Sequence, residues 1–364
     1  MKSIINIFIV LLIASCANMV APLGGDKDIT PPLLLHAETV QVTKLPNKRT
    51  IKLDFDEYIQ LNKWDEYFYI SPPLDKKPKK RIKGKALFLD VEGDLHQNTT
   101  YHVSFNSCIK DNNEGNILDT LTYRFSTTDI FDTLTISGTL KEAYSLNPMT
   151  NCWVMLFDKQ VKDSSIFKQT PNYIAKTDKN GFFYFPNLRE KEYKITALTG
   201  VDYNYNKEEK IAFLDSLVNP KIDSFISLFA FNPIIKRDSL MIDSISVEKD
   251  RNKSGFNVDT ISLQKSLPLG TLKININQDA PCVFQLLQDE KLIKEVSFIE
   301  TPHVIKDIFP GEYQLKYIID NNQDSMWNTG SWENRIQPER VLNYPFKIII
   351  RSNWDLELEW FIEE

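Results

Sequence analysis

The sequence predicts an all-β protein built from tandem β-sandwich domains that follow a signal peptide. Apolar and polar residues alternate along short segments, as in residues 51–56, and this period of two is typical of a half-buried strand. Such segments recur with turn-rich stretches between them, a spacing typical of sandwiches. The length of 364 residues suits roughly two to three domains.

Composition and charge exclude several classes of protein. Apolar residues make up 42% of the chain and charged residues 25%, so neither a disordered chain nor a polytopic membrane protein fits. The 43 basic and 49 acidic residues give a net charge of −6, so we expect no nucleic-acid partner. Only 12 residues are glycine, which argues against glycine-rich phosphate loops.

The N-terminal segment carries a targeting signal. Lys2 precedes an apolar run over residues 4–13 that is too short to cross a bilayer, which predicts a signal peptide over residues 1–15. The run ends in the motif Ile13-Ala14-Ser15-Cys16. This motif resembles the bacterial lipobox, which implies cleavage between Ser15 and Cys16 and attachment of lipid to the Cys16 thiol. The alternative is an ordinary signal peptide with a chance cysteine.

Residues 16–28 suit a flexible, lipidated tether because they include Pro22, Gly24 and Gly25. Ala17 occupies the sorting position of the lipobox family, where aspartate would resemble inner-membrane retention. We therefore expect a lipid anchor in the outer membrane, with the periplasmic and the surface face both open.

Residues 29–128 form the first predicted domain. Strands are expected over residues 51–55, 67–70, 86–91, 101–105 and 121–126. Four segments resemble the bacterial Ig-like domain named after the surface-layer protein SbsA: Asp28-Ile29-Thr30-Pro31-Pro32, Phe55-Asp56-Glu57-Tyr58, Asn98-Thr99-Thr100-Tyr101 and Phe125-Ser126-Thr127. The resemblance implies an Ig-like sandwich.

A basic run over residues 76–81, followed by Lys83 and Lys85, lies between two of these strands. It is either a contact for anionic lipid head groups or a solvated hairpin whose lysines discourage pairing between sheet edges. The sequence favours the hairpin.

Residues 133–213 form the second predicted domain. The turn Asp178-Lys179-Asn180-Gly181 leads into one strand, and Tyr193 lies on the next. This arrangement resembles the carboxypeptidase-regulatory or Cna-B-type transthyretin-like sandwich, although Lys191 stands where that family usually has glycine.

Residues 266–364 repeat the second domain and predict a second Cna-B-like sandwich. Gly138-Thr139-Leu140-Lys141 recurs as Gly270-Thr271-Leu272-Lys273, and Leu188, Tyr193 and Ile195 recur as Ile308, Tyr313 and Leu315. Residues 214–265 are predicted to be a long, partly ordered connector with an apolar island over residues 225–235. This connector is a candidate to add a strand to a neighbouring sheet.

The lipobox, the Ig-like block and stretches such as Pro338-Glu339 and Asn353-Trp354-Asp355 together resemble Ig-like-domain lipoproteins of Gram-negative cell envelopes. The resemblance implies location and architecture rather than a reaction.

The cysteines beyond Cys16 are Cys108, Cys152 and Cys282, one in each predicted domain. No domain can form its own disulfide, so we expect these three to be small buried residues.

Motifs for catalysis are missing from the sequence. The four histidines have no metal-sharing spacing, and nucleophile-elbow, Walker and dinucleotide motifs are absent. The densest acidic candidates for a carboxylate-based hydrolase are Asp54, Asp56 and Glu57, whose other interpretation is an exposed strand face. We predict no enzyme, no catalytic residue and no cofactor.

One loop offers oxygen ligands for calcium. Asp320, Asn322 and Asp324 alternate directly after a predicted strand. Ser325 stands where an EF-hand requires glycine, so the alternative to a structural calcium ion is a plain Asx-rich turn.

Four of the six tryptophans lie between residues 327 and 360. Trp354 and Trp360 fall on one face of a predicted strand and are expected in the core. Trp327 and Trp332 lie in the loop after the candidate calcium ligands and are the candidate recognition residues.

The sequence therefore predicts a lipid-anchored, non-catalytic lipoprotein that serves as an interaction or scaffold subunit of an outer-membrane assembly, with a membrane protein as partner. The alternative is a glycan- or ligand-binding surface lipoprotein, which requires exposed rings at Trp327 and Trp332. A carboxylate-based hydrolase is the third class.

Overall fold

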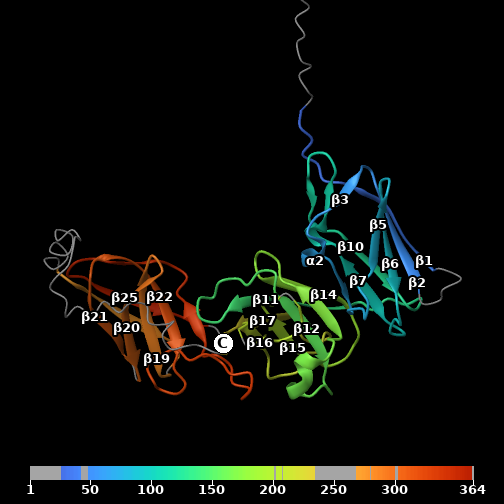
Figure 1. The fold of residues 1–364 in the computed structure, drawn as a ribbon. Coiled ribbons are helices and arrows are strands. Elements are labelled where there is room, and N and C mark those ends of the chain that lie inside the picture. Colours follow the sequence, from blue (N-terminus) through green and yellow to red (C-terminus); the bar gives the residue numbers. More distant parts are fainter. Residues whose placement is uncertain are drawn as a thin grey trace, which may run out of the picture. The chain divides into compact units, whose positions relative to one another are not determined.

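The computed structural model describes residues 26–41, 48–200, 202–206, 208–233, 268–278, 280–299 and 302–362. The predicted signal peptide, Ser15, Cys16 and most of the tether and connector lie outside these residues. Strands dominate the described part (Figure 1), which confirms the all-β prediction. Its helices are α2 (Trp64–Tyr67) and the 3₁₀ turns η1 (Asn106–Cys108) and η2 (Asp163–Lys168). None of them has the length and hydropathy that a membrane crossing needs.

Two compact units divide the described residues: those within 1–67, 78–91 and 105–121 form unit 1, and those within 68–77, 92–104 and 122–364 form unit 2. Unit 1 has one sheet in the order β1-β2-β6-β5 and one in the order β3-β8-β9. The bounds are β1 (Leu34–Gln41), β2 (Lys48–Phe55), β6 (Ala86–Glu92), β5 (Lys79–Lys83), β3 (Ile59–Leu61), β8 (Ile109–Asp111) and β9 (Ile117–Leu118).

The alternation that predicted β2 is confirmed. Ile51 and Leu53 are fully buried, whereas Lys52 Nζ lies 2.7 Å from Asp54 Oδ2. Asp56 Oδ1 accepts a hydrogen bond from the Leu33 amide at 2.8 Å. Asp54 thus pairs with a lysine of its own strand and Asp56 holds loop backbone in place, in keeping with the interpretation of a strand face.

The basic run supplies the edge strand β5, all of whose residues are exposed. Lys80 Nζ lies 4.7 Å from the centre of the Trp64 ring. Arg81 lies 4.3 Å from the Phe88 ring and 3.6 Å from Asp90. The contacts match the predicted hairpin, with its charges on a sheet edge.

Unit 2 contains a sheet of β10 (Thr122–Ser126), β7 (Thr100–Ser104) and β4 (Tyr69–Ser71), followed by two sandwiches. The first sandwich packs the sheet β14-β11-β17 against β13-β12-β15-β16. Its strands are β11 (Leu134–Glu142), β12 (Trp153–Asp158), β13 (Tyr173–Lys176), β14 (Phe182–Leu188), β15 (Tyr193–Leu198), β16 (Ile211–Phe213) and β17 (Phe225–Ala230).

The second sandwich of unit 2 has the sheets β21-β18-β25 and β20-β19-β22-β23, with β24 also paired to β22. Its strands are β18 (Gly270–Ile276), β19 (Cys282–Gln288), β20 (Lys291–Phe298), β21 (His303–Ile308), β22 (Gly311–Ile319), β23 (Val341–Asn343), β24 (Ile348–Ile350) and β25 (Asp355–Trp360).

The two sandwiches share a topology, as the repeated motifs predicted. In each, the first strand pairs antiparallel with one neighbour and parallel with the last strand: β11 with β14 and β17, β18 with β21 and β25. The repeated tyrosines also make the same contact. The Tyr193 hydroxyl donates to Arg189 O at 3.1 Å, and the Tyr313 hydroxyl donates to Phe309 O at 2.9 Å.

The boundary predicted at residue 213 needs a correction. Residues 225–230, assigned to the connector, form β17 and complete a sheet of the sandwich that begins at β11. Buried Ile226 and Leu228 join that sandwich's core, so the predicted connector does add a strand to a neighbouring sheet, and the domain extends beyond residue 213.

The three remaining cysteines are buried free thiols, as predicted. Burial raises the pKa of Cys108 and of Cys282 to about 12. These thiols therefore stay protonated and unreactive near neutral pH.

Candidate recognition site

The candidate residues lie in one loop of the last sandwich, residues 320–340, which we call the tryptophan loop. Asp320 is buried and closes the start of this loop. Its Oδ2 accepts a hydrogen bond from the Ser325 amide at 2.9 Å, and its Oδ1 accepts one from the Asp324 amide at 3.2 Å. Such side-chain to backbone bonds define an Asx-type turn.

The predicted calcium ligands come together in this turn, but their oxygens are already hydrogen-bonded. Asp324 Oδ2 accepts from the side-chain amides of Asn322 at 3.1 Å and Asn328 at 2.8 Å. In the part of the chain that the structure describes, no three acidic, histidine or cysteine side chains are grouped to hold a metal. The contacts support the Asx-rich turn rather than the calcium site.

Trp327 does not present its ring to solvent, so the expectation of an exposed recognition residue is wrong here. The residue is only 9% exposed. Its indole N–H donates to Glu339 O at 3.0 Å, and its ring lies 5.1 Å from that of Tyr144 in the preceding sandwich. A ring with its polar atom satisfied and its faces covered acts as a packing anchor.

Trp332 is half-buried and also packs against the preceding sandwich. Its ring lies 5.0 Å from Phe167 and 5.1 Å from Phe213. The Arg335 guanidinium lies 4.6 Å from the Trp332 ring and 4.1 Å from the Phe213 ring. Neither candidate tryptophan therefore offers the open ring that glycan stacking requires.

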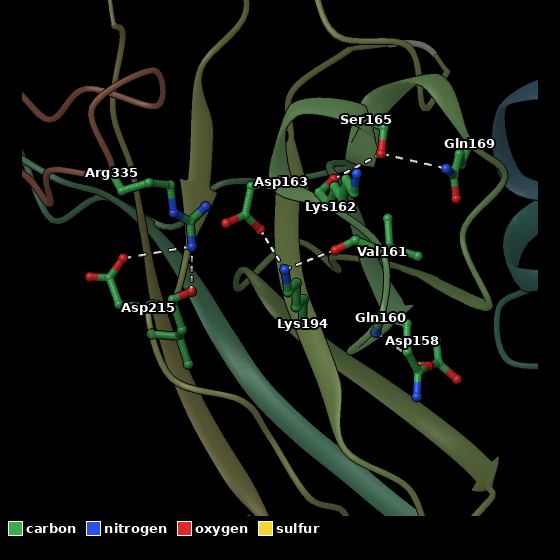
Figure 2. Close-up of polar contacts among 11 residues, drawn as sticks. Asp158, Gln160, Val161, Lys162, Asp163, Ser165, Gln169, Lys194, Asp215 and Arg335 are labelled. Atoms are coloured by element: carbon green, nitrogen blue, oxygen red, sulfur yellow. Dashed lines mark hydrogen bonds and ion pairs between the residues drawn. The ribbon is translucent and has the colours of Figure 1, made fainter.

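Figure 2 shows how polar groups fix the surface on which the tryptophan loop packs. Arg335 donates to Leu214 O at 3.1 Å and lies 3.6 Å from Asp215. Lys194 donates to Val161 O at 2.8 Å and to Asp163 at 2.7 Å. The Lys194 bonds tie η2 to strand β15, and η2 carries the Phe167 ring that meets Trp332.

Tyr144 is the centre of the contact with the last sandwich. Its hydroxyl donates to Gln285 Oε1 at 2.8 Å. Lys316 Nζ donates to Tyr144 O at 2.5 Å and lies 4.2 Å from the ring centre. Nothing in the sequence around Tyr144, Lys316 or Arg335 marks them as contact residues, because their hydrogen bonds to the other sandwich join residues more than a hundred positions apart.

We expect the buried Lys316 to make the free energy of unfolding depend on pH in the alkaline range. Burial lowers its pKa from 10.5 to about 8, so between these values the unfolded chain binds more protons than the folded one. The contribution of Lys316 to the free energy of unfolding therefore rises with pH across this window. The measurement is urea unfolding of the wild type and Lys316→Met from pH 7 to pH 10.5.

All other titrating groups are shared by the two proteins, so their difference isolates Lys316. Wild-type stability relative to the variant should increase with pH. A difference that stays constant over the window would contradict the assigned burial of the ammonium group.

The hydrophobic cluster that contains Trp327 extends to the β10-β7-β4 sheet within unit 2. Tyr69 lies 5.8 Å from Trp153 in a T-shaped arrangement, and the Ile174 amide donates to the Ser71 hydroxyl at 2.9 Å. Trp153 and Ile174 belong to the cluster that contains Trp327. One outer face of the middle sandwich is thus covered by side chains from both neighbouring blocks of unit 2.

Two polar hollows lie beside the middle sandwich. One of about 350 Å³ is lined mainly by charged residues, and one of about 240 Å³ shares Asp158 and Lys191 with it. Lys191 Nζ lies 3.3 Å from Asp158, and Lys159 Nζ lies 2.8 Å from Glu192. Because these charges pair with one another, the hollows favour neither an anionic nor a cationic ligand.

The last two tryptophans divide between core and surface. Trp360 is buried at 8% exposure, as predicted, whereas Trp354 is 51% exposed. Trp354 precedes β25 rather than lying in it, so the strand alternation does not turn its ring inward.

Comparison with known proteins addresses the first block. Residues 28–127 match the family model of the bacterial Ig-like domain. This agrees with the resemblance found in the four motifs. The match is confined to residues 28–127, and the comparison with curated protein sequences gives no match.

Several solved structures are similar at low identity. BcpA, the major pilin subunit of Bacillus cereus, is 12% identical over 51% of this chain and 65% of that one, with a TM-score of 0.19. Alpha-2-macroglobulin from Escherichia coli, domains MG0-NIE-MG1, is 12% identical over 86% of this chain and 96% of that one, with a TM-score of 0.22. The Bacillus anthracis TIE protein is 12% identical over 100% and 62%, with a TM-score of 0.18. This chain thus spans less than two thirds of the length of BcpA and of the TIE protein.

Proposed function

We propose that this protein is a non-catalytic lipoprotein, anchored in the outer membrane through Cys16, that serves as an interaction or scaffold subunit of an envelope assembly. The observation that carries the proposal is the packing of Trp327 against Tyr144. A scaffold must hold consecutive domains together by side-chain contacts rather than by a linker alone. The buried tryptophan supplies such a contact between two sandwiches.

The anchor explains how such a subunit would reach its partner. Lipidation of Cys16 with several acyl chains exceeds the two signals needed for stable membrane attachment. Attachment confines the chain to the membrane surface and so raises its effective concentration toward a membrane protein. The partner we propose is therefore a protein of the outer membrane.

Replacing Cys16 is expected to abolish the anchor. Cys16→Ser should lose incorporation of labelled palmitate and leave the membrane fraction, because serine offers no thiol for the lipid. The matched control is Cys152→Ser, a buried cysteine whose replacement should leave labelling intact. Palmitate labelling that persists in Cys16→Ser would contradict the anchor.

The partner is tested by cross-linking the tagged, full-length protein in intact membranes before mild solubilisation, followed by mass spectrometry. The expected result is the same outer-membrane protein in repeated experiments, lost with Cys16→Ser. Recovery of the lipoprotein without any other membrane protein would overturn the assembly role while leaving the anchor in place.

A further inference from the structure

Strand β17 is an edge strand whose outer side has a defined pattern of backbone groups. It pairs with β11 in parallel. The carbonyls of Ser224 and Ala230 accept from the amides of Ser137 and Ala143 at 3.0 and 2.8 Å. Successive residues of a strand direct their backbone amides and carbonyls to opposite sides. The even-numbered residues of β17 therefore direct these backbone groups to β11.

The odd-numbered residues of this strand therefore direct their backbone groups to the open side. Phe231 agrees with this alternation, because its amide and carbonyl both bond to Ile211, away from β11, at 2.9 Å. In β17 itself the odd positions are Phe225, Ser227 and Phe229. Their side chains are exposed, with Phe225 at 58% and Phe229 at 38%.

The exposed face continues across the sheet as an aromatic surface. Phe182 and Tyr184 on β14 are 38% and 47% exposed. Across the sheet, Thr139 of the central strand lies between Phe182 and Ser227. Ser137 lies between Tyr184 and Phe225. Aromatic rings thus flank a row of small hydroxyl residues on a partly exposed face of this sheet.

The equivalent strand of the last sandwich shows that the fold does not require this surface. β25 also pairs in parallel with its first strand, and its outward positions are Asp355, Glu357 and Glu359. Lys273 lies opposite Glu357 and pairs with it at 2.8 Å. Lys141, at the matching place in the repeat, lies opposite Phe229.

Charge on an edge strand prevents it from pairing with another chain. β25 carries acids and β5 carries lysines, whereas β17 carries neither charge nor proline. An uncharged edge with aromatic side chains is a template for a further strand.

We propose that β17 pairs antiparallel with β17 of a second copy of this chain, about a two-fold axis at Ser227. The outward pattern Phe225-Ser227-Phe229 is the same in both directions, as a two-fold interface requires. Phe225 lies opposite the partner's Phe229, and Ser227 lies opposite the partner's Ser227. Each of these pairs exchanges two backbone hydrogen bonds.

The self-complementary pattern favours a second copy over an unrelated partner. Binding of a different protein or of a glycan would not require the three outward positions to be the same in both strand directions. Joining the two edges makes one continuous sheet of six strands and brings the aromatic faces of both copies side by side. A short strand forms a small interface, so the membrane anchor of the proposed function would strengthen the pairing by raising local concentration.

The test is disulfide cross-linking of the full-length chain in membranes. Residues in a hydrogen-bonded antiparallel pair lie about 5.5 Å apart between Cα atoms, within the range of a disulfide. Mild oxidation of Ser227→Cys should therefore give a dimer that a reductant reverses. The native cysteines in the described residues are buried and leave little background.

Thr139→Cys is the matched control. Thr139 lies next to Ser227 in register and on the same face, but in the interior of the sheet. Pairing through the edge predicts a dimer for Ser227→Cys alone. Equal cross-linking of both variants would indicate face-to-face stacking and overturn the edge pairing, as would no dimer from either.

Sedimentation of the detergent-solubilised full chain gives an independent measurement. The wild type should dimerise as concentration rises, and Phe229→Glu should stay monomeric. This variant copies Glu357 and places a carboxylate opposite Lys141, so its melting temperature should match the wild type. A wild type that stays monomeric, or a Phe229→Glu variant that dimerises as the wild type does, would overturn the proposal.

Discussion

Replacing Trp327 with alanine is expected to lower the free energy of unfolding by about 3–5 kcal/mol. The ring is buried against Tyr144, and its indole N–H donates to the Glu339 carbonyl. Alanine leaves a cavity of indole size between the sandwiches and an unpaired carbonyl in it. The measurement is urea unfolding followed by circular dichroism.

Trp354→Ala is the control for Trp327→Ala. This tryptophan is 51% exposed, so its loss should cost well under half as much. Loss of the contact between Trp327 and Tyr144 should also separate the unfolding of the two sandwiches into distinct steps, visible as a broadened or biphasic transition. Equal effects of the two substitutions would show that Trp327 is not an anchor.

Replacing Gly138 with alanine is expected to destabilise the middle sandwich by about 1–3 kcal/mol. A β-carbon at this position would lie 2.0 Å from the Ile226 carbonyl oxygen and 2.5 Å from the Phe183 ring. The carbonyl belongs to β17, so relief of the clash must move that strand away from β11. We expect faster limited proteolysis within residues 214–233, together with the loss of stability.

Thr139→Ala controls for Gly138→Ala, because this neighbour points outward and its truncation leaves the sheet contact intact. Gly270 holds the matching place in the last sandwich, where a β-carbon would lie 2.7 Å from the Arg351 carbonyl oxygen. Gly270→Ala should therefore also weaken the last sandwich, through a clash with the segment between β24 and β25. A Gly138→Ala protein as stable as Thr139→Ala would exclude a tight approach of β17.

Local patterns sufficed to predict the strands and the repeat. The alternation around Ile51 and Leu53 depends on a period of two, which is a local property. The recurrence of Gly138-Thr139-Leu140-Lys141 predicted a shared topology, and in the middle sandwich a β-carbon at this glycine would lie 2.0 Å from the Ile226 carbonyl oxygen of β17. Such signals are readable because a few neighbouring residues carry them.

The candidate site was harder to predict because its contacts are not local. Trp327 follows a polar turn, which gave it the sequence context of an exposed loop residue. Its partner Tyr144 lies in the preceding sandwich, and no pattern links the two positions. Similarly, Asp320, Asn322 and Asp324 have the spacing of cation ligands, but backbone and side-chain amides occupy their oxygens.

The assignment of residues 225–230 failed in part for another reason. Parallel pairing joins β17 to a strand that lies more than eighty positions earlier, and short apolar islands do not reveal such distant partners.

The parallel pairing of first and last strands also governs the order in which these sandwiches can fold. A chain emerges from its N-terminal side first, so β11 is present long before β17, and β18 long before β25. Until the last strand arrives, Gly138 and Gly270 line an unfilled edge, and closing so long a loop is slow. Each sandwich is therefore completed only when its final strand has been delivered, which makes the folding of this chain sequential, one block at a time.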